Sequence, residues 1–244
     1  MKRHCTYLII AMIATVVIGL PAQAQETHKK ATEETSSDIP RLAAFHEVIF
    51  PMWHQAYPQK DYGLMKELAP KVSQFAKELP SIELPGILRD KKSKWDDKVR
   101  GFIQAASDYE SAVGKNDDAK LLEAAEKVHA EYEGLVRVIR PVSKELDAYH
   151  VVLYKIYHQY LPGMKWNELR ASSVKLVSQC GDLLKAPLPK RLESKIPSYE
   201  KARAELCSAT DQLAETSRGK DQEALKKAVD DVHSKYQKVE KVFD

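Results

Sequence analysis

The chain has 244 residues, with 38 Lys and Arg against 35 Asp and Glu and a formal net charge of +3. This length suits two domains of ordinary size. So balanced a charge indicates neither a nucleic-acid partner nor a strongly anionic surface.

Residues 1–24 have the pattern of a secretory signal peptide. A basic start at Lys2 and Arg3 precedes an apolar run over 7–20 and a small-residue cleavage site over 22–24. The apolar run is short for a transmembrane span, and no later stretch is long and apolar enough to be one. We therefore expect an exported protein, most simply a periplasmic one, with no membrane span after cleavage.

Residues 25–37 are polar and unpatterned, and we predict a disordered leader there. Apolar residues then recur at three- and four-residue steps, which predicts amphipathic helices. No segment alternates with a period of two, so the sequence predicts no sheet. The predicted helices lie near 38–58, 62–79, 91–113, 117–139, 142–161, 166–185, 196–216 and 221–243.

Six of the eight histidines form three pairs separated by 104 residues, as do several aromatic and proline positions. This fixed offset indicates an internal duplication. The predicted fold is all-α, a tandem duplication of an antiparallel four-helix bundle with repeats at 38–140 and 141–244. The pairs are His46 with His150, His54 with His158, and His129 with His233.

The first and fourth helices of each predicted bundle carry histidines at the same height. His46 and His129 are about 16 and 18 Å from one end at 1.5 Å per residue, so we expect them to face each other in the core. The same reasoning pairs His150 with His233.

The remaining paired histidines are expected to lie outside these sites. On a regular helix, His54 and His158 lie about 12 Å further along, near a helix end. They are expected to be surface histidines or ligands of a second, more exposed metal site.

Three explanations suit two imidazoles that meet in a bundle core. They are haem held from both sides, a transition metal such as Zn, Cu or Ni, and a structural pair without a cofactor. Glu126 and Asp230 each precede a histidine by three residues, so each shares a helical face with that histidine. Such a carboxylate is a possible additional ligand and favours a metal.

The unit resembles the cytochrome c′ family and its b-type periplasmic four-helix relatives. The resemblance rests on the last helix, where Tyr132 follows His129 and Tyr236 follows His233 by three residues. It implies haem binding at these histidines. The Cys-x-x-Cys-His attachment signal is absent, so the resemblance implies haem b held without a covalent bond.

The chain from residue 25 onward has two cysteines, Cys180 and Cys207, in the second repeat. They flank the connection between its second and third helices at comparable distances. In an oxidising compartment we expect them to form a disulfide.

The sequence has no nucleophile elbow, phosphate-binding glycine loop or zinc-protease helix, so we predict a binding protein without enzymatic activity. The leading hypothesis is a periplasmic metal-binding or metal-sensing protein with one buried His-His site per repeat. The alternatives are a bis-histidine b-type haem protein that transfers electrons and a cofactor-free structural or interaction module.

Overall fold

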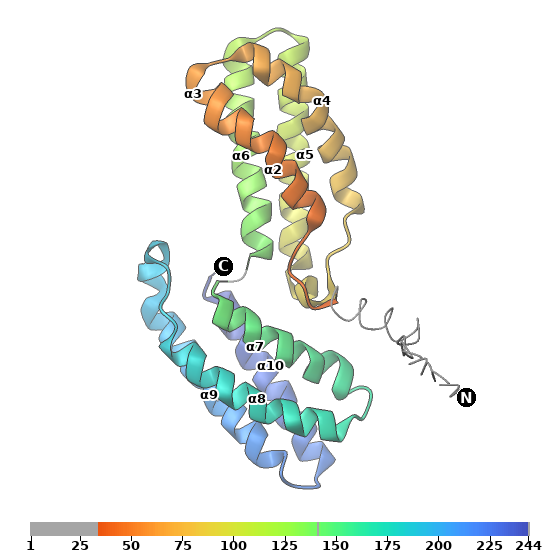
Figure 1. The fold of residues 1–244 in the computed structure, drawn as a ribbon, viewed down its shortest axis with the longest axis vertical. Helices are drawn as coiled ribbons and strands as arrows, with labels where there is room; N and C mark the ends of the chain where they lie inside the picture. The colour runs from red at the N-terminus through yellow and green to blue at the C-terminus, as the bar shows by residue number, and fades with distance from the viewer. Residues whose placement is uncertain (1–33, 141, 244) are drawn as a thin grey trace, which may run out of the picture. The chain divides into compact units, whose positions relative to one another are not determined.

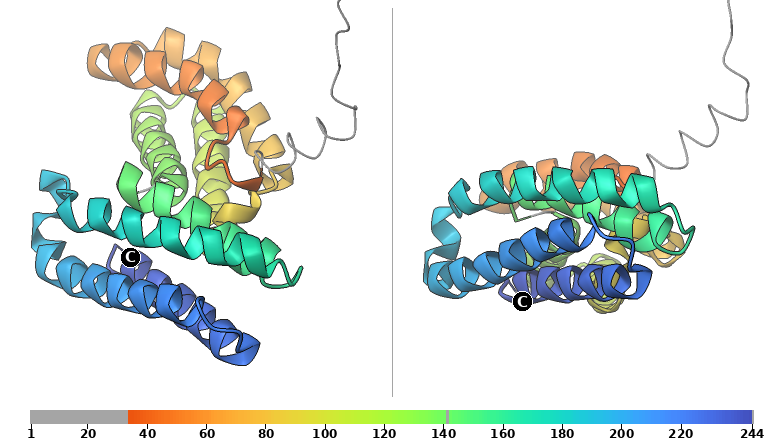
Figure 2. Two further views of the ribbon diagram at one scale, coloured as in Figure 1. Left: turned by 60° about the horizontal axis from the view of Figure 1, so that its bottom comes forward. Right: turned by 90° about the horizontal axis from the view of Figure 1, so that it is seen from below.

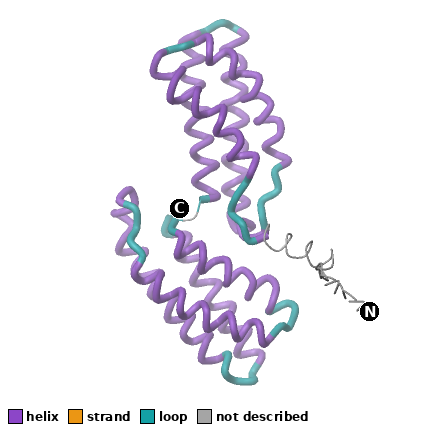
Figure 3. The backbone as a smooth tube through the Cα atoms, in the orientation of Figure 1, coloured by secondary structure: helices purple, strands orange, loops and turns teal. Residues whose placement is uncertain are grey.

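A computed structural model describes residues 34–140 and 142–243, and every regular element in these ranges is helical (Figure 3). The prediction of an all-helical fold is confirmed for these described residues. The predicted signal peptide and residues 25–33 of the predicted leader lie outside the described ranges. The elements up to Ile139 are α2 (Pro40–Pro51), η1 (Met52–Ala56), α3 (Tyr57–Gln59), α4 (Tyr62–Glu78), η2 (Leu79–Ser81), η3 (Gly86–Lys91), α5 (Lys92–Gly114) and α6 (Asp118–Ile139).

The elements after Arg140 begin 104 residues after counterparts in the first set. They are α7 (Lys144–Lys155), η4 (Ile156–Tyr160), α8 (Trp166–Lys185), η5 (Lys190–Lys195), α9 (Ile196–Thr216) and α10 (Gln222–Lys241). η1 and η4 are π-helices, whereas η2, η3 and η5 are 3-10 helices.

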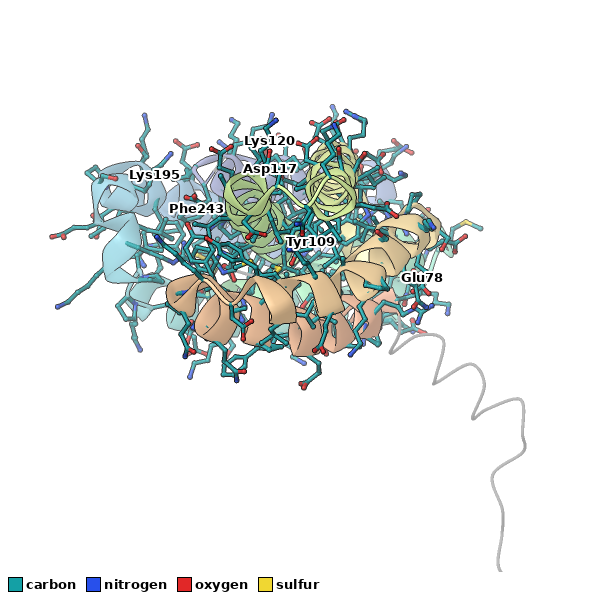
Figure 4. The ribbon with its side chains drawn as sticks, turned by 90° about the horizontal axis from the view of Figure 1, so that it is seen from above. Glu78, Tyr109, Asp117, Lys120, Lys195 and Phe243 are labelled. Atoms are coloured by element: carbon teal, nitrogen blue, oxygen red, sulfur yellow. A yellow bond between two sulfur atoms is a disulfide. The ribbon has the colours of Figure 1, made fainter. Side chains whose placement is uncertain are left out.

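Side-chain caps begin several of the helices. Asp61 accepts a hydrogen bond from a backbone N–H at the start of α4, and Asp117 does so at α6 (Figure 4). Ser143 and Asp221 have the same role at α7 and α10. Each cap provides a partner for a backbone donor that has none inside the helix, which fixes where the helix begins.

The helices up to α6 pack together (Figure 1), and the core that they enclose is rich in aromatic rings. Phe45 stacks on Phe75 with ring centroids 4.0 Å apart, and Phe102 meets Phe45 edge-on at 5.5 Å. The buried Tyr109 hydroxyl donates to the Met65 carbonyl oxygen at 2.8 Å. Helix α5 packs against both α4 and α6.

The helices from α7 to α10 enclose a second core, in which α9 packs between α8 and α10 (Figure 2). The Tyr149 hydroxyl lies 2.6 Å from Thr210 Oγ1, and both groups are buried. Cys180 on α8 and Cys207 on α9 form a disulfide with a Cα–Cα distance of 5.5 Å. This core is therefore closed by a covalent link that the first core lacks among its described residues.

Two features of the connections bear on the site. Helix α6 ends at Ile139 with extended backbone at Arg140, and α7 begins at Lys144, so the two do not form one continuous helix. The end of the predicted leader makes a defined contact, because Glu34 accepts a hydrogen bond from the Tyr154 hydroxyl at 2.6 Å.

No helix within the described ranges has the length and apolar character to cross a membrane.

Candidate functional site

A π-helical turn interrupts the first long helix of each set at the same relative position. In η1 the Tyr57 N–H bonds to the Met52 carbonyl, and in η4 the Leu161 N–H bonds to the Ile156 carbonyl. Each bond spans five residues, one more than in an α-helix, so the residues after it are rotated. Proline is not the common cause, because Pro51 precedes η1 whereas Lys155 precedes η4.

The first π-helix brings Trp53 to the histidine of α6, and His54 follows Trp53 in the same turn. The Trp53 ring stacks on His129 with centroids 3.9 Å apart and an interplanar angle of 6°. Phe50, which is 47% exposed, lies 4.9 Å from the His54 ring. We call Phe50, Trp53, His54 and His129 the first imidazole face.

The charged groups around His129 include His54. Burial lowers the pKa of His129, while the charge of Glu133 opposes the shift, and His54 and Arg137 add to it. His129 is therefore neutral at pH 7, with a ring nitrogen free to accept a hydrogen bond or bind a metal ion. The expectation that His54 lies apart from His129 assumed a regular helix, whereas His54 lies within a π-helical turn.

The second π-helix builds a matching arrangement on α10. Tyr157 stacks on His233 with centroids 3.8 Å apart and an angle of 8°. His158 stands perpendicular to His233 at 6.0 Å and lies 4.7 Å from the Tyr154 ring. We call Tyr154, Tyr157, His158 and His233 the second imidazole face, and each member lies 104 residues after its counterpart.

The second face is covered by a turn from the first half of the chain, the 3-10 helix η3. Arg89 Nη1 lies 3.2 Å from His158 Nδ1, and Arg89 Nη2 donates to the Tyr154 hydroxyl at 2.7 Å. The guanidinium also lies 5.2 Å from the centre of the Tyr154 ring. Asp90 Oδ2 lies 3.7 Å from His233 Nε2.

These contacts fix the protonation of the second face. Because a guanidinium only donates, His158 Nδ1 is the acceptor, and in the neutral ring the proton is on Nε2. Burial and the charge of Arg89 lower the pKa of His158. Burial also lowers the pKa of His233, whereas Asp90 and Asp230 oppose that shift. Burial and the hydrogen bond to Glu34 raise the pKa of Tyr154 to about 12.

The prediction that His46 faces His129 in the core needs correction. His46 is exposed, because the buried side of α2 consists of Leu42, Phe45 and Ile49. His46 follows Phe45 directly, and one residue turns a helix by about 100°, which points His46 out of the core. Its nearest described ring contacts are Phe50 at 5.9 Å and Tyr132 at 6.3 Å.

His150, at the matching place in α7, is half-buried but does not meet His233 as expected. Its ring stacks on Tyr236 at 4.3 Å. Burial lowers the pKa of His150 to about 3, and the charge of Lys91 acts in the same direction. In the second half the ring of His158 contacts His233, whereas His150 stacks on Tyr236 and interacts with His233 only through charge.

The two proposed carboxylate ligands lie at the surface. Glu126 and Asp230 are both exposed, and Glu126 accepts a hydrogen bond from the Tyr57 hydroxyl at 3.3 Å. Within the described ranges, no group of three or more His, Cys, Asp or Glu side chains is placed to hold a metal ion. The expected haem geometry, with His46 and His129 on opposite sides of one iron, does not fit an exposed His46.

Sequence reasoning missed Arg89 and Asp90, because they lie in a proline- and glycine-containing connection that we interpreted only as a loop. The adjacent Arg-Asp pair was the one available signal. Searches with protein-family models, among curated proteins and among solved structures found no match to this chain. The site therefore has to be interpreted from its own geometry.

Proposed function

We propose that this chain is an exported, non-catalytic docking protein built by tandem duplication of a helical unit. Duplication is supported by the 104-residue offset, which relates both the histidine pairs and the starts of the helices. Export is supported by the signal-like residues 1–24 and by the Cys180–Cys207 disulfide, since disulfides persist in oxidising compartments.

One observation carries the docking function: the second imidazole face already holds a peptide segment. Arg89 of η3 binds His158 and Tyr154 through its two terminal nitrogens. The first imidazole face repeats the stacked aromatic and imidazole pair with almost the same geometry. Within 34–140 and 142–243 no such segment covers Phe50 or His54, both of which are exposed.

The occupant we propose for the first face is a turn of a partner protein that carries Arg followed by Asp. The exposed Phe50 ring, which takes the place of Tyr154, offers a surface for a cation–π contact. His54 takes the place of His158 as an acceptor, and His129 takes the place of His233 beside the aspartate. Glu126 lies three residues before His129, and Glu133 lies four residues after it. Their negative charges attract a guanidinium.

A peptide of residues 83–93, which contains the Arg89-Asp90 pair, is a direct probe of this face. Trp53 stacks on His129, so its fluorescence reports occupancy. We expect the chain from residue 25 onward to bind this peptide in trans, and His129→Ala to weaken binding at least about tenfold. His46→Ala is the matched control, because His46 is exposed and outside the face.

The peptide with Arg replaced by Ala tests which occupant is correct. Equal binding of this peptide and the unchanged one would overturn the proposed Arg-Asp recognition. Sedimentation of the protein alone tests self-association. A dimer that is lost in both Arg89→Ala and His129→Ala would identify a second copy of the chain as the occupant.

Transition-metal binding at His54 and His129 is a second candidate function. The observation that favours it is the lowered pKa of His129 beside a second imidazole, since a neutral ring nitrogen is the form that binds Zn, Cu or Ni. In the described ranges no arginine forms a hydrogen bond with His54 or His129, whereas Arg89 Nη1 contacts His158 Nδ1. Elemental analysis and zinc titration would show one ion lost in His129→Ala and kept in His46→Ala.

A Soret band in the same purified protein would favour non-covalent haem over both candidates. Protein without metal and without a Soret band, which still binds the 83–93 peptide, is the result that the docking function predicts.

A further inference from the structure

A basic cavity of about 660 Å³ lies beside α6 and α10, and none of the residues of the two imidazole faces lines it. Six basic and two acidic side chains line it. The basic ones are Lys91, Lys94, Lys98, Arg137, Arg140 and Lys241, and the acidic ones are Asp90 and Glu240. A cavity of this volume is within the range that holds a small organic molecule.

The acidic side chains neutralise only part of this charge. Lys91 Nζ pairs with Glu240 at 2.9 Å, and Lys98 Nζ pairs with Glu131 at 3.3 Å. Arg137 and Arg140 form no ion pair within 34–140 and 142–243. A guanidinium donates two parallel hydrogen bonds to a phosphate or carboxylate, so two arginines at one cavity favour an anion with several oxygen atoms.

The backbone at Gly134 helps to place one of the lysines. A Cβ atom at this position would lie 2.8 Å from Lys98 Cδ, so the lysine chain lies directly over the glycine. Both residues line the cavity. The close approach holds the side chain of Lys98, which belongs to α5, against α6, the helix that carries Arg137.

The rest of the lining is apolar or neutral. Ile87, Val138, Val142 and Phe243 line the cavity beside the charged residues. His150 also lines it and is neutral at pH 7, since burial lowers its pKa to about 3. The positive charge therefore comes from lysine and arginine and persists across the neutral pH range.

We propose that this cavity binds an amphiphilic organic anion, with a phosphate or diphosphate head group held by Arg137 and Arg140 and an apolar body packed on Val138, Val142 and Phe243. The proposal is independent of the docking function. Several positive charges beside an apolar wall suit a molecule that has both parts, whereas a free inorganic ion would leave the wall without a partner.

Calorimetry on the chain from residue 25 onward tests both parts, with geranyl diphosphate as the probe and pyrophosphate and geraniol as its two halves. We expect geranyl diphosphate to bind and pyrophosphate to bind at least about tenfold more weakly. We expect no binding of geraniol. Arg137→Gln and Arg140→Gln should each weaken binding about tenfold, and added salt should weaken it further.

Arg100→Gln is the matched control, because Arg100 is exposed, lies outside the cavity and pairs with Asp97. Circular dichroism would show that each variant keeps its helices. Equal affinity in the wild type and the two cavity variants, or no binding of geranyl diphosphate at all, would overturn the proposal.

The same head group could belong to a lipid. Co-sedimentation with phosphatidylcholine vesicles that contain phosphatidic acid distinguishes this source. Sedimentation that is lost in Arg137→Gln, without binding of the soluble diphosphate, would overturn the small-molecule ligand in favour of a membrane surface.

Discussion

The two halves of the chain share a helical framework but stabilise it with different chemistry. The first core is aromatic, with Phe45, Phe75 and Phe102 in mutual contact. In the second, Tyr149 takes the place of Phe45 and bonds to Thr210, and a disulfide joins α8 to α9. Helix starts and the aspartate cap of the last helix thus correspond between the halves while the interiors differ, since several core compositions can fill one volume.

The two imidazole faces also share one arrangement of rings and differ in what surrounds it. Both have an aromatic ring stacked on the histidine of the last helix, but only the second is closed by Arg89 and Asp90. Histidine spacing alone would assign both faces one role. The covering segment makes the second face an internal contact, whereas Phe50 and His54 of the first face are exposed among the described residues.

The largest expected effect is on the aromatic core. Phe102→Ala removes a fully buried ring that contacts two others and should lower the free energy of unfolding by about 4 kcal/mol. Urea denaturation followed by circular dichroism measures this. Leu206→Ala is the matched change in the second half. A loss below about 1 kcal/mol in Phe102→Ala would contradict the central role of the aromatic cluster.

Removal of the disulfide should have the next largest effect. The double variant Cys180→Ala, Cys207→Ala frees a link between residues 27 apart and should lower the stability of the second half by about 3.5 kcal/mol. Reducing agent should act similarly on the wild type and have no effect on the variant. If the wild type melted at the same temperature with and without reductant, the covalent link would be unimportant.

Acid should destabilise the protein through His150. Its folded pKa of about 3 lies below the ordinary value of about 6.5, so the unfolded state binds more protons between these values. Stability contributed by neutral His150 is complete above about pH 6.5 and is lost as the pH falls toward 3. At pH 5 the loss amounts to as much as about 2 kcal/mol.

Denaturation midpoints at pH 7 and pH 5 measure this dependence. His150→Gln should reduce the difference between the two midpoints, whereas the exposed His46 provides the matched substitution in the first half. An unchanged difference in His150→Gln would assign the acid sensitivity to other groups.

The smallest effect is expected from the buried hydroxyl pair. Thr210 donates to the Leu206 carbonyl, so the Tyr149 hydroxyl donates to Thr210. Tyr149→Phe should cost about 1 kcal/mol, since it removes one hydrogen bond and leaves Thr210 with a partner. The reverse change, Phe45→Tyr, should cost at least as much, because Ala106 offers no acceptor at the matching place. A stabilised Phe45→Tyr variant would show that the first core holds an unrecognised acceptor.

The sequence by itself determined the helices and their repetition. Apolar spacing, capping residues such as Asp117 and Asp221, and the constant offset of 104 residues are local or periodic signals, and they predict elements close to those observed. The pairing of Cys180 with Cys207 also follows from their positions around one connection.

Only the tertiary structure decided which histidines meet. An extra residue in each π-helical turn shifts the phase of the helix that follows it, and His158 lies 6.0 Å from His233. His46 precedes the first π-helix and points outward because it follows the buried Phe45. A prediction that assumes a regular helix of 3.6 residues per turn does not include this shift. The contact of Arg89 with His158 joins residues 69 positions apart, and no local pattern encodes it.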